Sequence, residues 1–287
     1  MKKNIPWWLR ISAKILLSRI PIGYDFWQRI GLFRHGHMDQ ASYVINVFNS
    51  HISMSGLDGD LQGKTLLELG PGDSIFTAIV AACYGCNTIL IDAGSFATRN
   101  INSYKKFSEN LEKRGLSPPN ISDAETLDDI LISCKARYLT DGLSSFKYIE
   151  TGSVDLILSQ AVLEHVRKND FLETMKECAR VLVDSGVASH RVDLKDHLGG
   201  RLNNLRFNER LWESDFFVKS GFYTNRIRFS DMMKLFSVAG FSIDASDISR
   251  WEELPIKRHS LAQEFLHTTD DDLLVSGFTV RLSKQRE

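Results

Sequence analysis

The fold is decided by residues 66–74, which read Leu66-Leu67-Glu68-Leu69-Gly70-Pro71-Gly72-Asp73-Ser74. An apolar strand here runs into a tight turn with two glycines, and a helix-like stretch follows. A turn from strand to helix in a parallel sheet needs positive φ angles and close approach of backbone to ligand, and glycine permits both because it lacks a Cβ. The segment therefore predicts a nucleoside-binding turn at the end of the first strand.

Downstream of this turn, short apolar runs alternate with helix-like stretches, as in a doubly wound α/β fold. We predict a mostly parallel, Rossmann-like sheet of seven strands within a domain that spans residues 61–287. The expected strands are 65–69, 88–91, 136–139, 154–159, 186–190, 241–245 and 278–282, and the expected helices are 76–84, 100–114, 171–181 and 230–239. The polar and aromatic residues 194–226 interrupt the alternation, so we interpret them as a lid inserted after the fifth strand.

The type of ligand follows from the residues around the turn. Asp92 ends the second strand, 20 residues after Gly72, where a carboxylate can accept hydrogen bonds from both ribose hydroxyls. A dinucleotide loop has a third glycine three residues after the second, but this chain has Ile75 there. Glu68 adds an acidic group near the turn. Together these residues favour a positively charged nucleoside over a pyrophosphate.

The stretch resembles motif I of class I S-adenosylmethionine-dependent methyltransferases, and the similarity covers about residues 60–190. Asp141-Gly142 resembles the family's adenine motif, residues 154–166 resemble its fourth-strand motif, and residues 177–186 resemble the helix and turn before strand five. Ser74 departs from the pattern, because the family often has a third glycine there. The resemblance implies S-adenosylmethionine as cofactor.

The resemblance also implies residue roles in binding that cofactor. Glu68 lies near the methionine amino group, Gly70 and Gly72 line the methionyl and ribose portion, and Asp92 binds the ribose. Asp141 and Gly142 face the adenine. Four further residues complete the expected cofactor contacts: Asp73, Ser74, Ser159 and Gln160.

Candidate catalytic residues follow strands four and five. Methyl transfer is an in-line displacement, and an alcohol acceptor also needs a base, for which histidine is suited near neutral pH. Ligands bind beyond the carboxyl ends of the strands, where His165, His190, Asp193 and His197 fall. We expect His190 to be the base. The alternative, that His190, Asp193 and His197 hold a metal ion, stays open, although their spacing matches no recognised ligand pattern, and we predict no metal site.

The insertion mixes arginines with aromatic residues, a combination that suits stacking a sugar or an aromatic ring and pairing an acidic group. We predict substrate contacts from Arg201, Arg206, Trp212 and Tyr223. The chain as a whole resembles bacterial methyltransferases of surface-polysaccharide gene clusters. The expected reaction is therefore O-methylation of a glycan or related polar metabolite in polysaccharide biosynthesis. A small natural product or lipid-like acceptor, and a catalytically inactive assembly partner that binds the cofactor, are the alternatives.

Composition limits location and partners. The net charge of -1 argues against nucleic acid as substrate, and four cysteines fit a reducing, cytoplasmic environment. Residues 1–36 carry seven basic residues against one acidic residue, with tryptophans among them, yet no apolar run is long enough to span a membrane. We expect residues 1–60 to form a helical cap on the core, and peripheral contact of residues 1–36 with the inner face of the membrane stays open.

Overall fold

The computed structural model describes residues 41–57 and 61–285. The predictions made for residues 1–36, and most of the predicted cap, lie outside these ranges. Within the described residues no helix is both long and apolar enough to cross a membrane.

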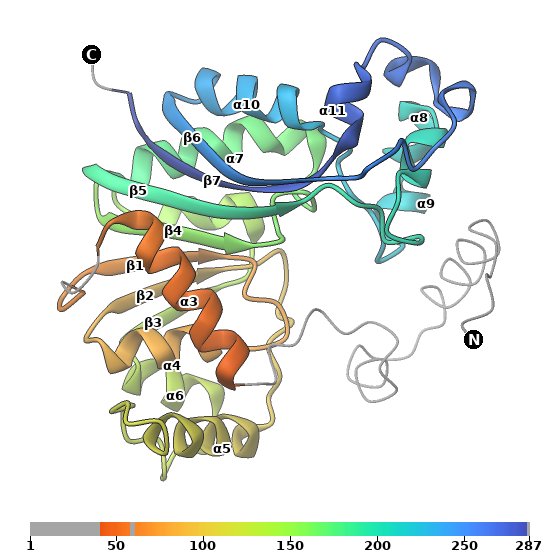
Figure 1. The fold of residues 1–287 in the computed structure, drawn as a ribbon. Helices are drawn as coiled ribbons and strands as arrows, with labels where there is room; N and C mark the ends of the chain where they lie inside the picture. Colours follow the sequence, from red (N-terminus) through yellow and green to blue (C-terminus); the bar gives the residue numbers. More distant parts are fainter. Residues whose placement is uncertain (1–40, 58–60, 286–287) are drawn as a thin grey trace.

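A seven-stranded sheet forms the centre of the molecule, in the order β3-β2-β1-β4-β5-β7-β6 (Figure 1). Only β7 runs antiparallel to its neighbours, β5 and β6. The strands are β1 (Thr65–Leu69), β2 (Asn87–Ile91), β3 (Ala136–Leu139), β4 (Val154–Gln160), β5 (Leu182–Asp193), β6 (Phe241–Arg250) and β7 (Val275–Lys284). The predicted fold class is therefore confirmed, with the reversal of strand order between β1 and β4 that creates a ligand crevice.

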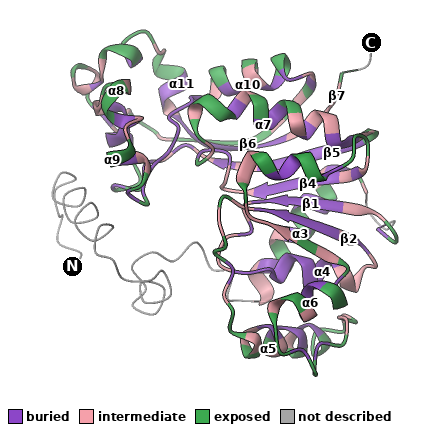
Figure 2. Cartoon of the chain, turned by 180° about the vertical axis from the view of Figure 1, so that it is seen from behind, coloured by how far each residue is buried: buried purple, intermediate pink, exposed green. Residues whose placement is uncertain are grey.

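Helices cover both faces of the sheet. On one face, α3 (Ala41–Ser55), α4 (Phe76–Cys83), α5 (Ile101–Glu112) and α6 (Leu127–Ser133) share an apolar core with β1, β2 and β4. On the other face, η1 (Gly142–Tyr148), α7 (Lys168–Val181) and α10 (Phe229–Val238) pack against the alternate residues of the same strands and against β5, β6 and β7. Figure 2 shows the central strands buried, with exposed residues on the outer helix surfaces.

The lid lies at the end of the sheet where β4 and β5 finish (Figure 1). It contains η2 (Asn203–Arg206), α8 (Glu209–Trp212) and α9 (Asp215–Val218) from the predicted insertion, and also η3 (Arg258–Ser260), η4 (Gln263–Phe265) and α11 (Asp270–Leu274) from a second segment. The second segment connects β6 to β7 and was not expected from the sequence. Its apolar residues pack against Leu202 and Leu205 of the first segment, so the two insertions form one unit.

Candidate active site

The glycine turn has the conformation that its sequence predicts. Gly70 and Gly72 have φ angles of 67° and 66°, in the left-handed region that glycine favours. A Cβ on Gly70 would lie 2.6 Å from both methyl groups of Val162, in the loop after β4. The loop after β4 therefore packs directly against the turn, which brings the predicted methionyl site next to the end of β4. Ala161 in that loop has a φ of 55°, unusual for a residue with a Cβ, and its N–H donates to the Arg191 carbonyl at 2.8 Å.

Glu68 lies beneath this turn, and its surroundings fit a cationic ligand. Its Oε1 accepts a hydrogen bond from the Thr77 hydroxyl at 3.1 Å, while Oε2 is buried with no hydrogen-bond partner among the described residues. Burial, with a smaller contribution from the nearby charge of Asp92, raises the pKa of Glu68 to about 8. A buried carboxyl group with an unused oxygen is costly unless a donor or a positive charge meets it. The methionine ammonium of the expected cofactor supplies both.

Asp92 links the turn to the adenine side of the site. Its Oδ2 accepts from the Gly72 N–H at 2.9 Å, and its backbone carbonyl accepts from the Gly142 N–H at 2.8 Å. Asp141 is exposed beside Gly142, whose φ is 54°. The structure therefore brings together the residues predicted for ribose and adenine. Asp73 and Ser74 follow in the same turn, and the buried Ser74 Oγ has no hydrogen-bond partner among the described residues.

His190, our predicted base, is fully buried. Its Nδ1 lies 2.8 Å from the hydroxyl of Ser159, which is also fully buried. Burial lowers the pKa of His190 to about 3, so the ring is neutral at physiological pH. A group without exposed surface is badly placed to take a proton from an acceptor, so the burial of His190 argues against its predicted role as base. The sequence places His190 in β5 but does not show which way the ring points.

The exposed histidines form a pair. His165, in the loop after β4, and His197, in the lid, have parallel rings 4.9 Å apart, with their Nε2 atoms at 3.1 Å. His165 Nδ1 lies 2.9 Å from the Tyr223 carbonyl, which can only accept, so Nδ1 carries a proton. A neutral His165 then has its lone pair on Nε2 and accepts the Nε2–H of His197.

The metal alternative finds no support in the geometry. The described residues contain no group of three or more histidine, cysteine, aspartate or glutamate side chains placed to hold a metal ion. His190 points to Ser159, while Asp193 pairs with Lys195, whose N–H lies 2.9 Å and whose Nζ lies 3.4 Å from its carboxylate. His190, Asp193 and His197 therefore do not converge as one ligand set.

Two of the four predicted substrate residues belong to the interior of the lid. Trp212 is fully buried in an aromatic cluster with Phe217 and Phe222, and its Nε1 donates to the Thr224 carbonyl at 2.7 Å. Tyr223 lies in the same cluster, and its hydroxyl donates to the carboxylate of Glu213. This corrects the prediction that both rings stack on substrate, because neither presents a face to solvent.

The arginines of the lid also differ in burial: Arg226 and Arg228 are buried, whereas Arg201 and Arg206 are not. Arg226 lies between the rings of Trp212 and Phe265, 5.3 and 5.1 Å from their centres, and Arg228 donates to backbone carbonyls around β7. Burial lowers the pKa of Arg228 to about 10. Arg201 is exposed and Arg206 is half-buried, with Nε donating to Asn203 Oδ1 at 3.1 Å. Of the four residues predicted to contact substrate, Arg201 and Arg206 are therefore the two that are not buried.

Two features of the site were not predicted. Glu164, beside His165, is buried with no hydrogen-bond partner for either carboxylate oxygen among the described residues, and burial raises its pKa to about 8. His51 of α3 reaches across to β5, where its Nδ1 lies 2.7 Å from the Ser189 hydroxyl. The sequence offered a weak signal for His51, since it stands beside the apolar stripe Val44, Phe48 and Ile52.

The chain is similar to known methyltransferases. A family described as "Methyltransferase domain" matches residues 52–246, more than half of the chain. No curated protein matched the chain. A methyltransferase structure from Archaeoglobus fulgidus is 11% identical, with a TM-score of 0.48 over 92% of this chain and 100% of that one. Magnesium protoporphyrin IX methyltransferase from Synechocystis PCC 6803 is 14% identical, with a TM-score of 0.49 over 95% of this chain and 100% of that one.

The family match covers both the glycine turn and the residues that surround it, from the end of α3 to the first half of β6. Its span therefore includes Gly70, Asp92 and the loop after β4. The chain belongs to the class I S-adenosylmethionine-dependent methyltransferases, with S-adenosylmethionine as its cofactor.

Proposed function

We propose that this methyltransferase methylates a hydroxyl group of a glycan or a related polar metabolite, with the His165–His197 pair as its general base. The observation that carries the proposal is the 3.1 Å approach of the two Nε2 atoms at the carboxyl ends of β4 and β5. Substrates of open α/β sheets bind at these ends. A hydroxyl acceptor, unlike an amine with a free lone pair, benefits from a base that removes its proton during transfer.

The cofactor-binding residues and the histidine pair have separate roles in the proposed reaction. S-adenosylmethionine supplies the electrophilic methyl group when it is bound. Glu68, the glycine turn and Asp92 hold it and fix its orientation, which is the larger part of catalysis for an in-line displacement. The acceptor hydroxyl gives its proton to the imidazole of His197, and the resulting imidazolium is stabilised by His165, whose ring the Tyr223 carbonyl holds in place.

The test replaces each histidine with glutamine and measures methyl transfer to hydroxylated acceptors. We expect kcat to fall about 100-fold in His197→Gln, because positioned proton transfer contributes at least that much. Affinity for S-adenosylhomocysteine stays unchanged, since neither ring lies among the cofactor residues. His267→Gln is the matched control, because His267 is exposed in the second lid segment, away from the pair.

Two outcomes contradict this proposal. Full turnover in both His165→Gln and His197→Gln would remove the base from the mechanism. Tight cofactor binding without turnover of any acceptor, in the unmodified protein, would instead favour an inactive assembly partner.

A further inference from the structure

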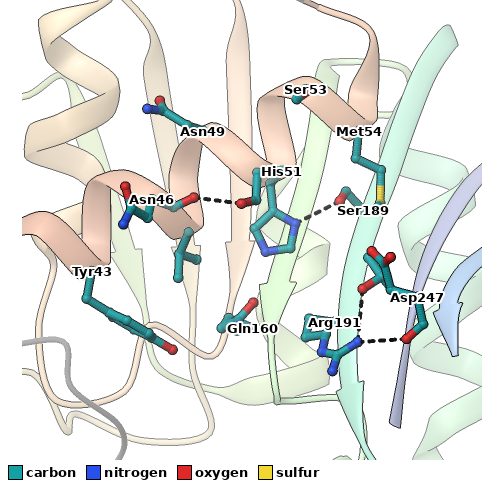
Figure 3. Close-up of a pocket in the computed structure, with 13 residues that line it drawn as sticks. Tyr43, Asn46, Asn49, His51, Ser53, Met54, Gln160, Ser189, Arg191 and Asp247 are labelled. Carbon is teal, nitrogen blue, oxygen red and sulfur yellow. Dashed lines mark hydrogen bonds between the residues drawn. The ribbon is translucent and has the colours of Figure 1, made fainter. Parts of the chain in front are cut away.

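A groove of about 930 Å³, lined by both polar and apolar side chains, runs along α3 on the face of the sheet opposite α7 and α10. Figure 3 shows α3 on one side of it, with Gln160 of β4 and Arg191 of β5 along its floor and Asp247 of β6 on the far side. His51 extends from α3 to Ser189 and closes the floor. The groove belongs to none of the sites described above, although Gln160 lies in both this groove and the expected cofactor contacts.

The far wall of the groove is suited to a polar ligand rather than to a packed helix. Along β7, Phe278, Val280 and Leu282 join the core under α7 and α10, so Thr279 and Arg281 face the groove side. Their partners on β6 are Ser246 and Asp244. A helix that packs on a sheet needs an apolar stripe beneath it, and this face has none among the described residues.

The charges in the lining are balanced. Arg191 Nη1 donates to the Asp247 carbonyl at 3.3 Å and to Thr279 Oγ1 at 3.2 Å, and both acceptors are neutral. Asp247 occupies a bulge in β6 with a φ of 45°, a backbone conformation that costs free energy and that holds it opposite Arg191. One guanidinium and one carboxylate cancel, whereas sites for phosphate or carboxylate ligands gather several cations.

The remaining polar lining consists of amides and hydroxyls. Asn46, Asn49 and Gln160 each offer donors and acceptors, as do the hydroxyls of Ser50 and Ser53. A sugar hydroxyl also donates and accepts, so a neutral saccharide matches this lining at many points. The lining residues of α3 extend from Tyr43 to Met54, about 16 Å at the rise of an α-helix, which is longer than a single sugar ring needs.

We propose that this groove binds a neutral saccharide chain, so that the acceptor is an oligosaccharide and the unit to be methylated lies where Gln160 meets the cofactor site. This inference rests on the proposed function, because it names the substrate class of the same enzyme. The groove inference goes beyond the proposed function, because it places most of the acceptor contacts on α3 and β5, outside the lid.

The experiment measures binding of the full chain, loaded with S-adenosylhomocysteine, to a glycan array. The array carries neutral and acidic microbial oligosaccharides and also the monosaccharides of which they are built. We expect binding to neutral chains, stronger for tetrasaccharides than for monosaccharides. Arg191→Met and Asn46→Ala should each weaken it at least fivefold. Asn46 is exposed, so its replacement leaves folding intact even if Arg191→Met does not. Arg137→Gln, at the opposite edge of the sheet, is the control and should bind as the unmodified protein does.

Several results would overturn the inference: no binding to any neutral chain, preference for acidic glycans, equal binding of monosaccharides and tetrasaccharides, or unchanged binding in both groove variants. Methyl transfer measured in parallel separates the two proposals. Methyl transfer to monosaccharides that is unchanged in the groove variants would reject saccharide binding in the groove and leave the proposed hydroxyl methylation supported. Binding that depends on saccharide length, without methyl transfer to any hydroxyl, would support the groove and reject the proposed hydroxyl methylation.

Discussion

Substitution of Gly70 by alanine tests whether the loop after β4 is packed on the glycine turn. The new Cβ would lie 2.6 Å from Val162 Cγ1 and Cγ2, closer than real Cβ atoms approach other atoms, and 3.2 Å from Val162 Cβ, which is also a tight contact. Overpacking of this kind costs about 1–3 kcal/mol. The φ of 67° adds about 1–2 kcal/mol for a residue with a Cβ. We therefore expect Gly70→Ala to lower the free energy of unfolding by about 2–5 kcal/mol.

The two contributions can be separated, because Val162→Ala removes both methyl groups at 2.6 Å and leaves the backbone strain. Urea unfolding of the two single variants and the double variant forms a thermodynamic cycle. The double variant should be less destabilised than the sum of the single variants by about 1–3 kcal/mol. Calorimetry with S-adenosylhomocysteine should show weaker binding in Gly70→Ala and partial recovery in the double variant.

Either of two results would refute this reasoning. A Gly70→Ala variant as stable as the unmodified protein would mean that the turn is loosely packed. Additive effects in the cycle would mean that Val162 does not contact position 70, and that the cost comes from the backbone alone.

Four further outcomes are expected. The pKa of Glu68 is raised to about 8, so its carboxyl group is protonated at pH 6 and must lose that proton when a cation binds. Calorimetry should therefore show that the affinity for the cofactor rises from pH 6 to 8. The Glu68→Gln variant should not show that rise. Trp212→Ala should destabilise the lid by about 3–5 kcal/mol in thermal unfolding, whereas an effect on KM alone would restore its role in substrate binding. The pKa of His51 is lowered to about 4, so its contribution to stability is present above its unfolded pKa and is lost as pH falls from about 6.5 to 4; the acid dependence of urea unfolding should be shallower in His51→Gln. Liposome flotation with and without residues 1–36 distinguishes the expected cap from the membrane alternative: a cap predicts equal flotation, whereas membrane contact through that segment predicts that its removal abolishes flotation with anionic liposomes.

The cofactor side of the site could be predicted because its residues are close in sequence to the strands that position them. Gly70, Gly72 and Asp92 follow directly after β1 and β2, and parallel strands bring their carboxyl ends to one edge. Glu68 was placed correctly near the turn, but its burial, which raises its pKa, depends on neighbours from other elements.

The proposed acceptor side of the site could be predicted from the sequence only as a region. Histidines after strands four and five were expected there, yet the side of β5 on which His190 points depends on its pairing with β4 and β7. The pairing of His165 with His197 depends on the path of the lid. That path is fixed by Arg226, Trp212 and Phe265, which come from two insertions.

The sequence by itself determined the α/β class, the strands and the glycine turn. The spacing of apolar residues, the positive φ angles of glycine and the position of a residue at the end of a strand are all local properties of the chain. Only the tertiary structure decided which polar side chains are buried, which two histidines meet, and that α3 leaves a groove over β5, β7 and β6. These are properties of contacts between segments more than 30 residues apart, such as His51 with Ser189, and no local pattern in the chain encodes them.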